Sequence, residues 1–298
     1  GGDLSDLFNG CTNLTNINGC TFNATTSLAR AFKGCSKITI NPITTIADTV
    51  TDISEMYSGC TGITDISGMT FGSGITSSTD WITNCPITTA NNVTIKCSGF
   101  EFGSSTLTTC NNLTITSTCT SLDNLFSWCT SLNSITFNSA SDFSNVTTMK
   151  WTFARTDIVS LDLSNVTVSS KLTNLRECFS PCTKLTEITM FNNMEEASLS
   201  DISGLFMGNE KLTTLRNFKL GSNCTVPLMC QFAFKYPTGS GTMISNTDGM
   251  YINCDCIRVR DDDTGVISVN GGSSSFLYSL FAGCDSIVKF TELELGPN

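Results

Sequence analysis

The chain has 298 residues, of which 40% are hydrophobic and only 14% are charged, and its formal net charge is −10. The apolar share is sufficient for a packed interior, whereas the charged share lies well below the ~25% that is usual in soluble domains. A negative net charge argues against a nucleic-acid-binding surface and against electrostatic attachment to anionic lipid. No apolar run approaches the ~18 residues that a membrane-spanning segment requires.

One sequence phrase recurs along the chain, with a large apolar residue three positions before a Cys and Leu or Ile three positions after it. The first copy is Phe8, Cys11 and Leu14, and later copies are centred on Cys35, Cys60, Cys85, Cys110, Cys129, Cys182, Cys254 and Cys284. The copy at Cys85 has Thr88 in place of the final Leu or Ile. From Cys11 to Cys110 the spacing is 24, 25, 25 and 25 residues. Such a period is typical of solenoid repeats, in which each unit buries its apolar face against its neighbours.

Residues 121–137 show the elements expected in one unit. Leu122, Leu125 and Phe126 lie three and four residues apart, which predicts a short helix. After Cys129 apolar residues alternate with polar ones as far as Phe137, which predicts a strand. The predicted fold class is therefore an α/β solenoid of the leucine-rich-repeat type. We expect about a dozen units of ~25 residues, with a parallel β-sheet on one face and short helices or turns on the other.

The repeat favours one solenoid domain over residues 1–298. The phrase fits poorly near residues 72–79, 97–118 and 226–247, and we expect irregular structure there. The chain begins with Gly1 rather than Met, and a strand pattern persists close to its other end. Because the ends of an open solenoid expose unpaired sheet edges, we expect further chain or another subunit to cover both ends.

The cysteines are better explained by packing than by disulfide chemistry. Thr156 and Asn209 stand in the Cys position of two further copies of the phrase, and neither residue can replace half of a disulfide. A small, buried, weakly hydrogen-bonding side chain fits all three residue types. We therefore predict a structural ladder of free thiols formed by Cys11, Cys35, Cys60, Cys85, Cys110, Cys129, Cys182, Cys254 and Cys284.

Two alternatives for the cysteines stay open. Neighbouring thiols in the ladder would lie about 5 Å apart, the spacing of strands in a sheet, so oxidation between them is geometrically feasible. Among the cysteines outside the ladder, Cys224 and Cys230 are the expected pair if a disulfide forms.

The sequence predicts that the protein is not an enzyme. It contains no histidine, which excludes Ser/His/Asp and Cys/His arrangements and histidine-containing zinc sites. It contains no paired Cys-x-x-Cys phrases and no glycine-rich phosphate loop. The acidic run at residues 261–263 offers oxygen ligands for Ca²⁺ but lacks the EF-hand spacing, so a solvated turn is favoured. We expect neither a cofactor nor a metal site.

Several phrases resemble a known repeat family. Residues 31–40 and 280–287 resemble the BspA-like leucine-rich repeat, and residues 143–149 and 161–167 are similar to the related bacterial surface-protein repeat. The resemblance implies a binding or adhesion domain that is secreted or displayed on a cell surface. Similar repeats also occur in phage virion proteins, so the resemblance also implies a virion location as an alternative. The fold by itself supplies a surface and no chemistry.

The strand pattern indicates where a protein or glycan ligand would bind. With Ile135 and Phe137 directed inward, Thr136 is directed outward, and its counterparts in later units are Asp162, Thr189 and Arg216. We predict that these side chains contact the ligand through the sheet face. Trp81, Trp128 and Trp151 are predicted to pack at the edges between units, and Trp128 becomes a further contact if it is exposed.

A second class of function stays open. The low charge and small polar surface also suit a structural assembly component, such as a phage fibre, decoration or tail protein or a surface-layer subunit. Its partners would then be neighbouring subunits. Neither hypothesis involves nucleic acid or membrane insertion.

Overall fold

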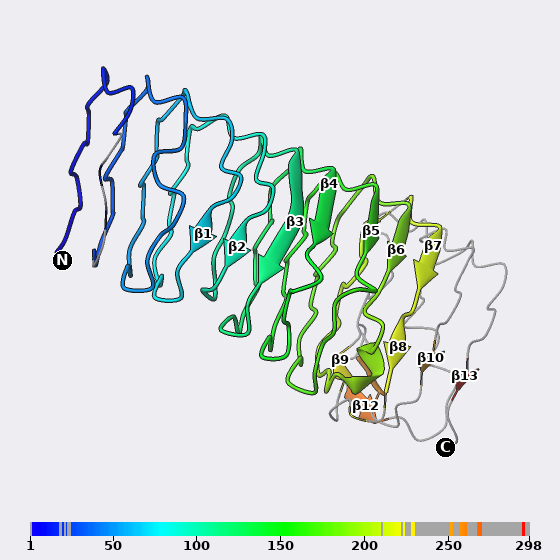
Figure 1. Cartoon of the computed structure of the whole chain (residues 1–298). Helices are drawn as coiled ribbons and strands as arrows, with labels where there is room; N and C mark the ends of the chain where they lie inside the picture. Colours follow the sequence, from blue (N-terminus) through cyan, green and yellow to red (C-terminus); the bar gives the residue numbers. More distant parts are fainter. Residues whose placement is uncertain are drawn as a thin grey trace. The chain divides into compact units, whose positions relative to one another are not determined.

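The computed structural model describes residues 2–17, 20, 22, 25–209, 211–221 and 223, together with five short strands further along the chain (Figure 1). The chain divides into two compact units, Gly1–Ser141 and Asp142–Asn298. Each unit is a parallel β-solenoid in its described part, and the two are treated separately below.

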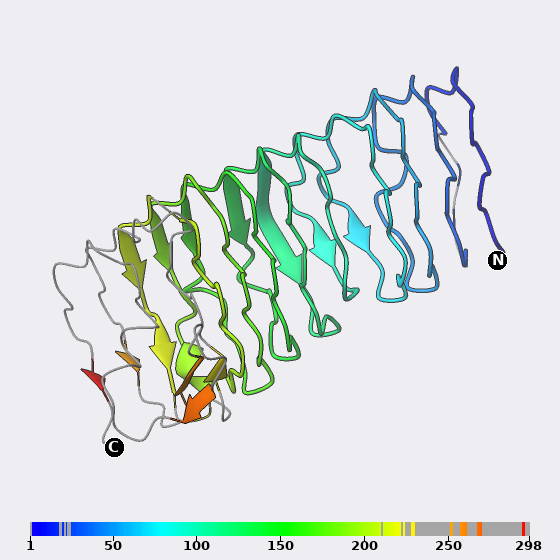
Figure 2. The ribbon, with the colours of Figure 1, turned by 180° about the vertical axis from the view of Figure 1, so that it is seen from behind.

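In the first unit, successive coils of the chain lie side by side (Figures 1 and 2). Parallel bridges join Asp3 to Ser27, Ser27 to Asp52 and Asp52 to Ser77. A parallel sheet forms on another side of the coils, in the order β1 (Thr70–Phe71), β2 (Thr94–Ile95), β3 (Thr109–Ile115) and β4 (Ser134–Phe137). The parallel sheet expected from the repeat is therefore present.

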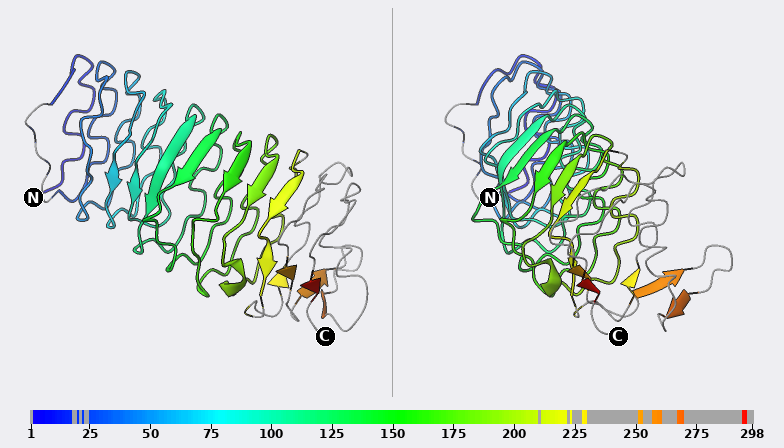
Figure 3. Two further views of the ribbon diagram at one scale, coloured as in Figure 1. Left: turned by 45° about the vertical axis from the view of Figure 1, so that its right-hand side comes forward. Right: turned by 90° about the vertical axis from the view of Figure 1, so that its right-hand side faces the viewer.

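The second unit has the same organisation (Figure 3). Thr148, Asn174 and Asp201 are joined by parallel bridges. The strands β5 (Ser160–Asp162), β6 (Glu187–Thr189) and β7 (Thr214–Arg216) form a parallel sheet in that order. The other elements are the 3₁₀ helix η1 (Met194–Glu196) and the strands β8 (Lys219–Leu220), β9 (Leu228–Met229), β10 (Tyr251–Ile252), β11 (Ile257–Arg260), β12 (Ile267–Val269) and β13 (Glu294–Leu295). β11 and β12 pair antiparallel.

In all described coils but the fifth, the part that was expected to be helical is instead a run of consecutive turns, and we call this part of every coil the turn face. In the first unit the turn faces of six coils begin at Leu4, Leu28, Ile53, Ser78, Gly99 and Leu122. In the second unit three described turn faces begin at Met149, Leu175 and Ile202. The described residues therefore do not support the expected dozen units.

Of the two alternatives expected on this face, short helices or turns, the described residues show turns and do not support helices, because the backbone hydrogen bonds of the turn face leave the coil. The N–H of Ala31 bonds to the carbonyl of Leu28 three residues earlier, at 3.0 Å. The N–H of the next residue, Phe32, bonds to the carbonyl of Met56 in the following coil, at 2.9 Å. An α-helix would need both donors for its own i−4 carbonyls. Consecutive turns also direct residues i, i+3 and i+4 inward. A spacing of three and four between apolar residues therefore fits a run of turns as well as a helix.

The turn faces also contain residues with positive φ, a backbone conformation that is absent from the interior of a right-handed helix. Most carry two residues with positive φ, four positions apart; the pairs are Asp6 and Gly10, Arg30 and Gly34, Glu55 and Gly59, Asp80 and Asn84, Gly99 and Gly103, Asn124 and Trp128, Trp151 and Arg155, and Gly204 and Gly208. Glycine is frequent at the second position because it adopts positive φ without the steric cost that other residues incur.

Stacked rings and repeated hydroxyl groups hold neighbouring coils together. The rings of Phe8, Phe32 and Tyr57 stack with successive centroids 5.4 Å apart. The hydroxyl of Thr51 donates to the carbonyl of Thr26, and that of Thr76 donates to the carbonyl of Thr51, each at 3.2 Å. The abundance of Ser and Thr therefore serves inter-coil hydrogen bonding as well as solvation.

Candidate functional site: a cleft in the turn face

The turn faces of the first four coils are joined by a regular set of hydrogen bonds. At each of the three interfaces between them, four backbone N–H groups of one coil donate to carbonyls of the next. Between the third and fourth coils the donors are Ile53, Glu55, Tyr57 and Gly59, and their acceptors are Ser77, Thr79, Trp81 and Thr83, at 2.7–2.9 Å. The donors are alternate residues, and so are the acceptors.

This set of bonds is missing between the fourth and fifth coils. The equivalent donors are Ser78, Asp80, Ile82 and Asn84, and within the described residues none of them bonds to a backbone carbonyl of the fifth coil. The sheet side of the same interface is intact, because Ala90 donates to Thr109 at 2.9 Å. The opening is therefore confined to the turn face.

A shortened fifth coil explains the opening. From Gly99 to Ser104 the chain advances five residues, whereas the matching part of the second coil, from Leu28 to Cys35, takes seven. The short segment still follows the sixth coil, since Gly99 donates to the carbonyl of Ser121 at 3.2 Å. Its five residues cannot match the seven-residue outline of either neighbour completely: within the described residues it forms two of the four backbone bonds to the sixth coil and accepts none of the four from the fourth.

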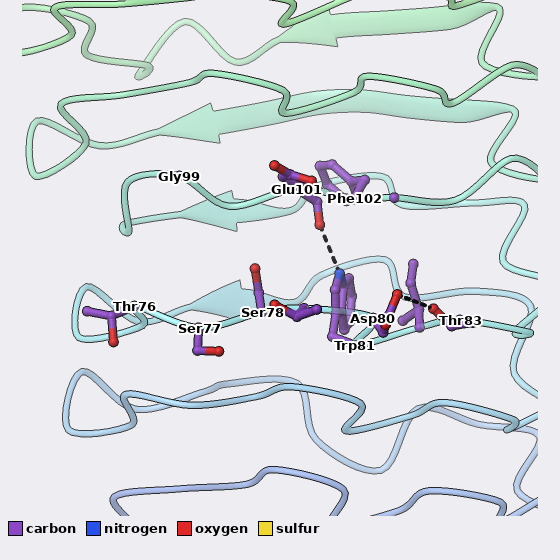
Figure 4. Close-up of a pocket in the computed structure, with 12 residues that line it drawn as sticks. Thr76, Ser77, Ser78, Asp80, Trp81, Thr83, Gly99, Glu101 and Phe102 are labelled. Atoms are coloured by element: carbon purple, nitrogen blue, oxygen red, sulfur yellow. Dashed lines mark hydrogen bonds between the residues drawn. The ribbon is translucent and has the colours of Figure 1, made fainter.

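The opening forms two adjoining pockets with volumes of about 320 and 520 Å³. Figure 4 shows the first of them. They share Ile82, Thr83 and Gly103. We call the two pockets together the turn-face cleft. Its lining comprises residues 61, 76–86, 99 and 101–106, most of which carry hydroxyl, amide or carboxyl groups.

Aromatic side chains close the floor of the cleft. The Trp81 indole N–H donates to the carbonyl oxygen of Glu101 at 3.0 Å, across the opening (Figure 4). The Trp81 ring packs against Phe71 and Phe100, with centroids 5.2 and 5.5 Å away, and only 2% of Trp81 is exposed. One side-chain hydrogen bond thus replaces part of the missing backbone set.

The walls of the cleft are polar and acidic. Asp80 and Thr83 are exposed, whereas their counterparts in the third coil, Glu55 and Ser58, are half-buried. The Thr83 hydroxyl donates to a carboxylate oxygen of Asp80 at 3.0 Å. Desolvation raises the pKa of the Glu101 carboxyl, and a hydrogen bond with the Asn124 side chain only partly opposes that effect.

The residues predicted to contact a ligand lie elsewhere and are already engaged. Thr136 is exposed on β4, and its hydroxyl oxygen accepts the N–H of Asn112 at 2.9 Å. Asp162 is exposed at the end of β5 and accepts the N–H of Ser164 at 2.9 Å. Thr189 is half-buried opposite Arg216, whose guanidinium pairs with the carboxylate of Glu187. None of these predicted residues lines the cleft.

The three tryptophans differ from one another. Trp81 is buried in the floor of the cleft, whereas 58% of Trp128 and 36% of Trp151 are exposed. The exposure of Trp128 meets the condition under which it was predicted to be a further contact. Trp128 has a φ of 64° at the position where the second and third coils have Gly34 and Gly59.

The thiol ladder has a structural arrangement in the described residues. The thiols of Cys35, Cys60 and Cys85 are buried, and they donate to the carbonyls of Phe8, Phe32 and Tyr57 in the preceding coil at 3.1, 3.0 and 2.7 Å. Cys129 and Cys182 are also buried and free, whereas Cys11 is exposed. The Cys182 thiol also donates to a backbone carbonyl, that of Phe153, at 3.1 Å.

Cys110 does not belong to the ladder, which corrects the sequence prediction. It lies within β3 opposite Ile135, and the fifth coil has Ser104 at the position that Cys129 holds in the sixth. Because this coil is short, the Cys of the repeat phrase lies in the strand, beyond the ladder position that Ser104 occupies. The predicted ladder members Cys254 and Cys284, the pair Cys224 and Cys230, and the acidic run at 261–263 lie outside the described residues.

The cleft was not predicted from the sequence, although the sequence contains one signal of it. The paired glycines Gly99 and Gly103 fall within 97–118, where the repeat phrase fits poorly. Among the residues that the structure describes, no cluster of three or more metal-binding side chains occurs. No helix in this described part is long and apolar enough to cross a membrane.

Comparisons with known proteins give limited similarity. The profile of a family described as "Mycoplasma protein of unknown function, DUF285" matches residues 102–222. A crystal structure of a leucine-rich repeat protein from Bacteroides ovatus is 15% identical, with a TM-score of 0.36, and the alignment covers 98% of this chain and 76% of that chain. Among curated proteins, none matches the chain. The solenoid assignment therefore rests on the bridges and hydrogen bonds described above.

Proposed function

We propose that this protein is a non-catalytic binding module whose ligand, a protein or a glycan, enters the turn-face cleft. The observation that carries the proposal is the row of four backbone donors, from Ser78 to Asn84, that lacks the acceptors present at the three preceding interfaces. A repeat solenoid displays such a feature on a rigid scaffold and brings no chemistry of its own.

Energetic considerations favour a binding role for these donors. A buried N–H group without a partner costs about 1–3 kcal/mol, so a packed interface would not retain four of them. In an open cleft, water satisfies these groups until a ligand replaces it. The predicted sheet-face contacts are less suitable, because the polar atoms of Thr136 and Arg216 are already bonded within the protein.

The location of the protein belongs to the same proposal. A secreted or surface-displayed position follows from the repeat resemblance, and it suits a module that binds an external partner. Display on a virion is the alternative implied by that resemblance.

Blocking the cleft tests the function directly. Thr83→Trp places a bulky side chain at a residue shared by the two pockets. Asn9→Trp is the matched control, because Asn9 is exposed at the same position of the first coil. The wild type and both variants would be screened on arrays of peptides and glycans. We expect the ligands bound by the wild type to be lost by T83W and kept by N9W, and binding that survives T83W would contradict the proposal.

A further inference from the structure

We infer that the ligand of the turn-face cleft is a polypeptide segment in extended conformation that carries basic side chains and pairs with the open edge of the fourth coil. This inference rests on the proposed function and specifies its ligand. Three features of the cleft support it: the arrangement of its donors, its charge, and the state of its aromatic residues.

The row of N–H donors fits a ligand that presents a matching row of carbonyl oxygens. At the closed interfaces, N–H groups of alternate residues meet main-chain carbonyls of alternate residues in the next coil. An extended peptide also presents the carbonyls along one of its edges from alternate residues. Addition of such a segment to an open backbone edge is a common mode of peptide recognition, in which main-chain bonds supply affinity and side chains supply specificity.

The acidic side chains of the cleft favour a ligand with positively charged groups. Asp6 and Glu55 hold the same turn-face position as Asp80, and each has a cationic partner within the chain: Arg30 pairs with Asp6 at 2.6 Å, and Lys33 pairs with Glu55. In the described part of the chain, neither Asp80 nor Glu101 forms an ion pair. The net charge of −10 further favours the approach of a basic ligand over an acidic one.

The aromatic residues of the cleft argue against a glycan. Trp81 is 2% exposed, and Phe102 is fully buried. Their rings pack against Phe71, Phe100 and Phe126, so no ring face is presented to a sugar. The available groups are main-chain donors, hydroxyls and carboxylates, which match the main chain and basic side chains of a peptide.

The test is an amide-resolved titration of the whole protein with defined probes. The first probe is an acetylated and amidated hexapeptide that alternates threonine and lysine. The second is the same peptide with glutamate in place of lysine, and the third is maltohexaose. We expect the lysine peptide to shift the ¹⁵N–¹H signals of Ser78, Asp80, Ile82 and Asn84, and the glutamate peptide to bind about tenfold more weakly.

Conservative variants test the charge contribution without removing the cleft. Asp80→Asn and Glu101→Gln are each expected to weaken lysine-peptide binding by about threefold to fivefold, as expected for a partly exposed ion pair. Glu55→Gln is the control, because that residue lies at a closed interface. Two further lysine peptides, each with one backbone amide replaced by an ester, should bind more weakly because an ester carbonyl is a poorer acceptor.

The outcomes separate this inference from the proposed function. If maltohexaose shifts the four amides and the lysine peptide does not, the cleft binds ligands but the inference is wrong. If neither probe shifts them at millimolar concentration, the inference is also wrong. Equal affinity of the wild type, D80N and E101Q for the lysine peptide would refute the assigned role of the carboxylates. The blocking variant T83W tests the proposed function independently of these results.

Discussion

Replacing Trp81 with Phe should lower the free energy of unfolding more than the same replacement at an exposed tryptophan does. The substitution keeps a ring in the floor of the cleft, next to Phe71 and Phe100, and removes the indole N–H that bonds to Glu101. It thereby separates the hydrogen bond between the Trp81 indole and the Glu101 carbonyl from the packing around it.

The expected loss has two parts. A hydrogen bond between neutral groups contributes about 0.5–1.5 kcal/mol, and the freed Glu101 carbonyl can turn to water in the cleft, which favours the lower half of that range. Trp81 is 2% exposed, so nearly all of the ring atoms that Phe lacks are buried. Their removal costs about 1–2 kcal/mol through lost burial and the small cavity left behind. The sum is about 1.5–3 kcal/mol.

Urea unfolding of the full chain, followed by far-ultraviolet circular dichroism, would measure the change. Trp128→Phe is the matched control, because 58% of that residue is exposed and we expect a change within about 0.5 kcal/mol. If W81F is no more destabilising than W128F, the assigned role of Trp81 in holding the open interface is wrong.

Two further predictions concern coil spacing and buried thiols. Gly72→Ala should destabilise the protein by about 3 kcal/mol or more, because an added Cβ would lie 2.4 Å from the Ala47 carbonyl oxygen of the neighbouring coil. Gly59→Ala should cost only about 1 kcal/mol, because Gly59 has positive φ but its added Cβ would meet no atom closer than 3.6 Å. Equal loss of stability in the two variants, measured by thermal unfolding, would refute the predicted difference between them. Burial raises the pKa of Cys129 and of Cys182 to about 12, so the folded protein keeps both thiols neutral where the unfolded chain ionises them. Stability should therefore fall as pH rises from about 8.5 towards 12, by up to about 1.4 kcal/mol per pH unit for each thiol, and Cys129→Ala should reduce the slope measured by urea unfolding.

Repeat architecture was predictable from the sequence because each coil must bury the same side-chain positions. The phrase around Cys35 and Cys60 recurs with a period of about 25 residues, and the bridges between Ser27, Asp52 and Ser77 follow that period. The strand alternation at β4 was also readable, since Ile135 and Phe137 are buried and Thr136 is exposed. Both features depend only on the order of apolar and polar residues along the chain.

The conformation of the turn face was not predictable in the same way. Leu122, Leu125 and Phe126 satisfy a helical spacing, and consecutive turns direct the same three residues inward. The choice between the two depends on where the backbone donors find acceptors. Those acceptors lie in the next coil, about 25 residues along the chain, so local sequence carries little information about them.

By itself, the sequence determined that this protein is a repeat solenoid with a packed apolar interior, because the period and the alternation are properties of the chain order. Only the tertiary structure decided where the solenoid opens. The gap arises from a mismatch in length between two neighbouring coils, seven residues in the regular turn face against five between Gly99 and Ser104. Such a mismatch has meaning only when the coils lie side by side, since it leaves the donors from Ser78 to Asn84 without their acceptors.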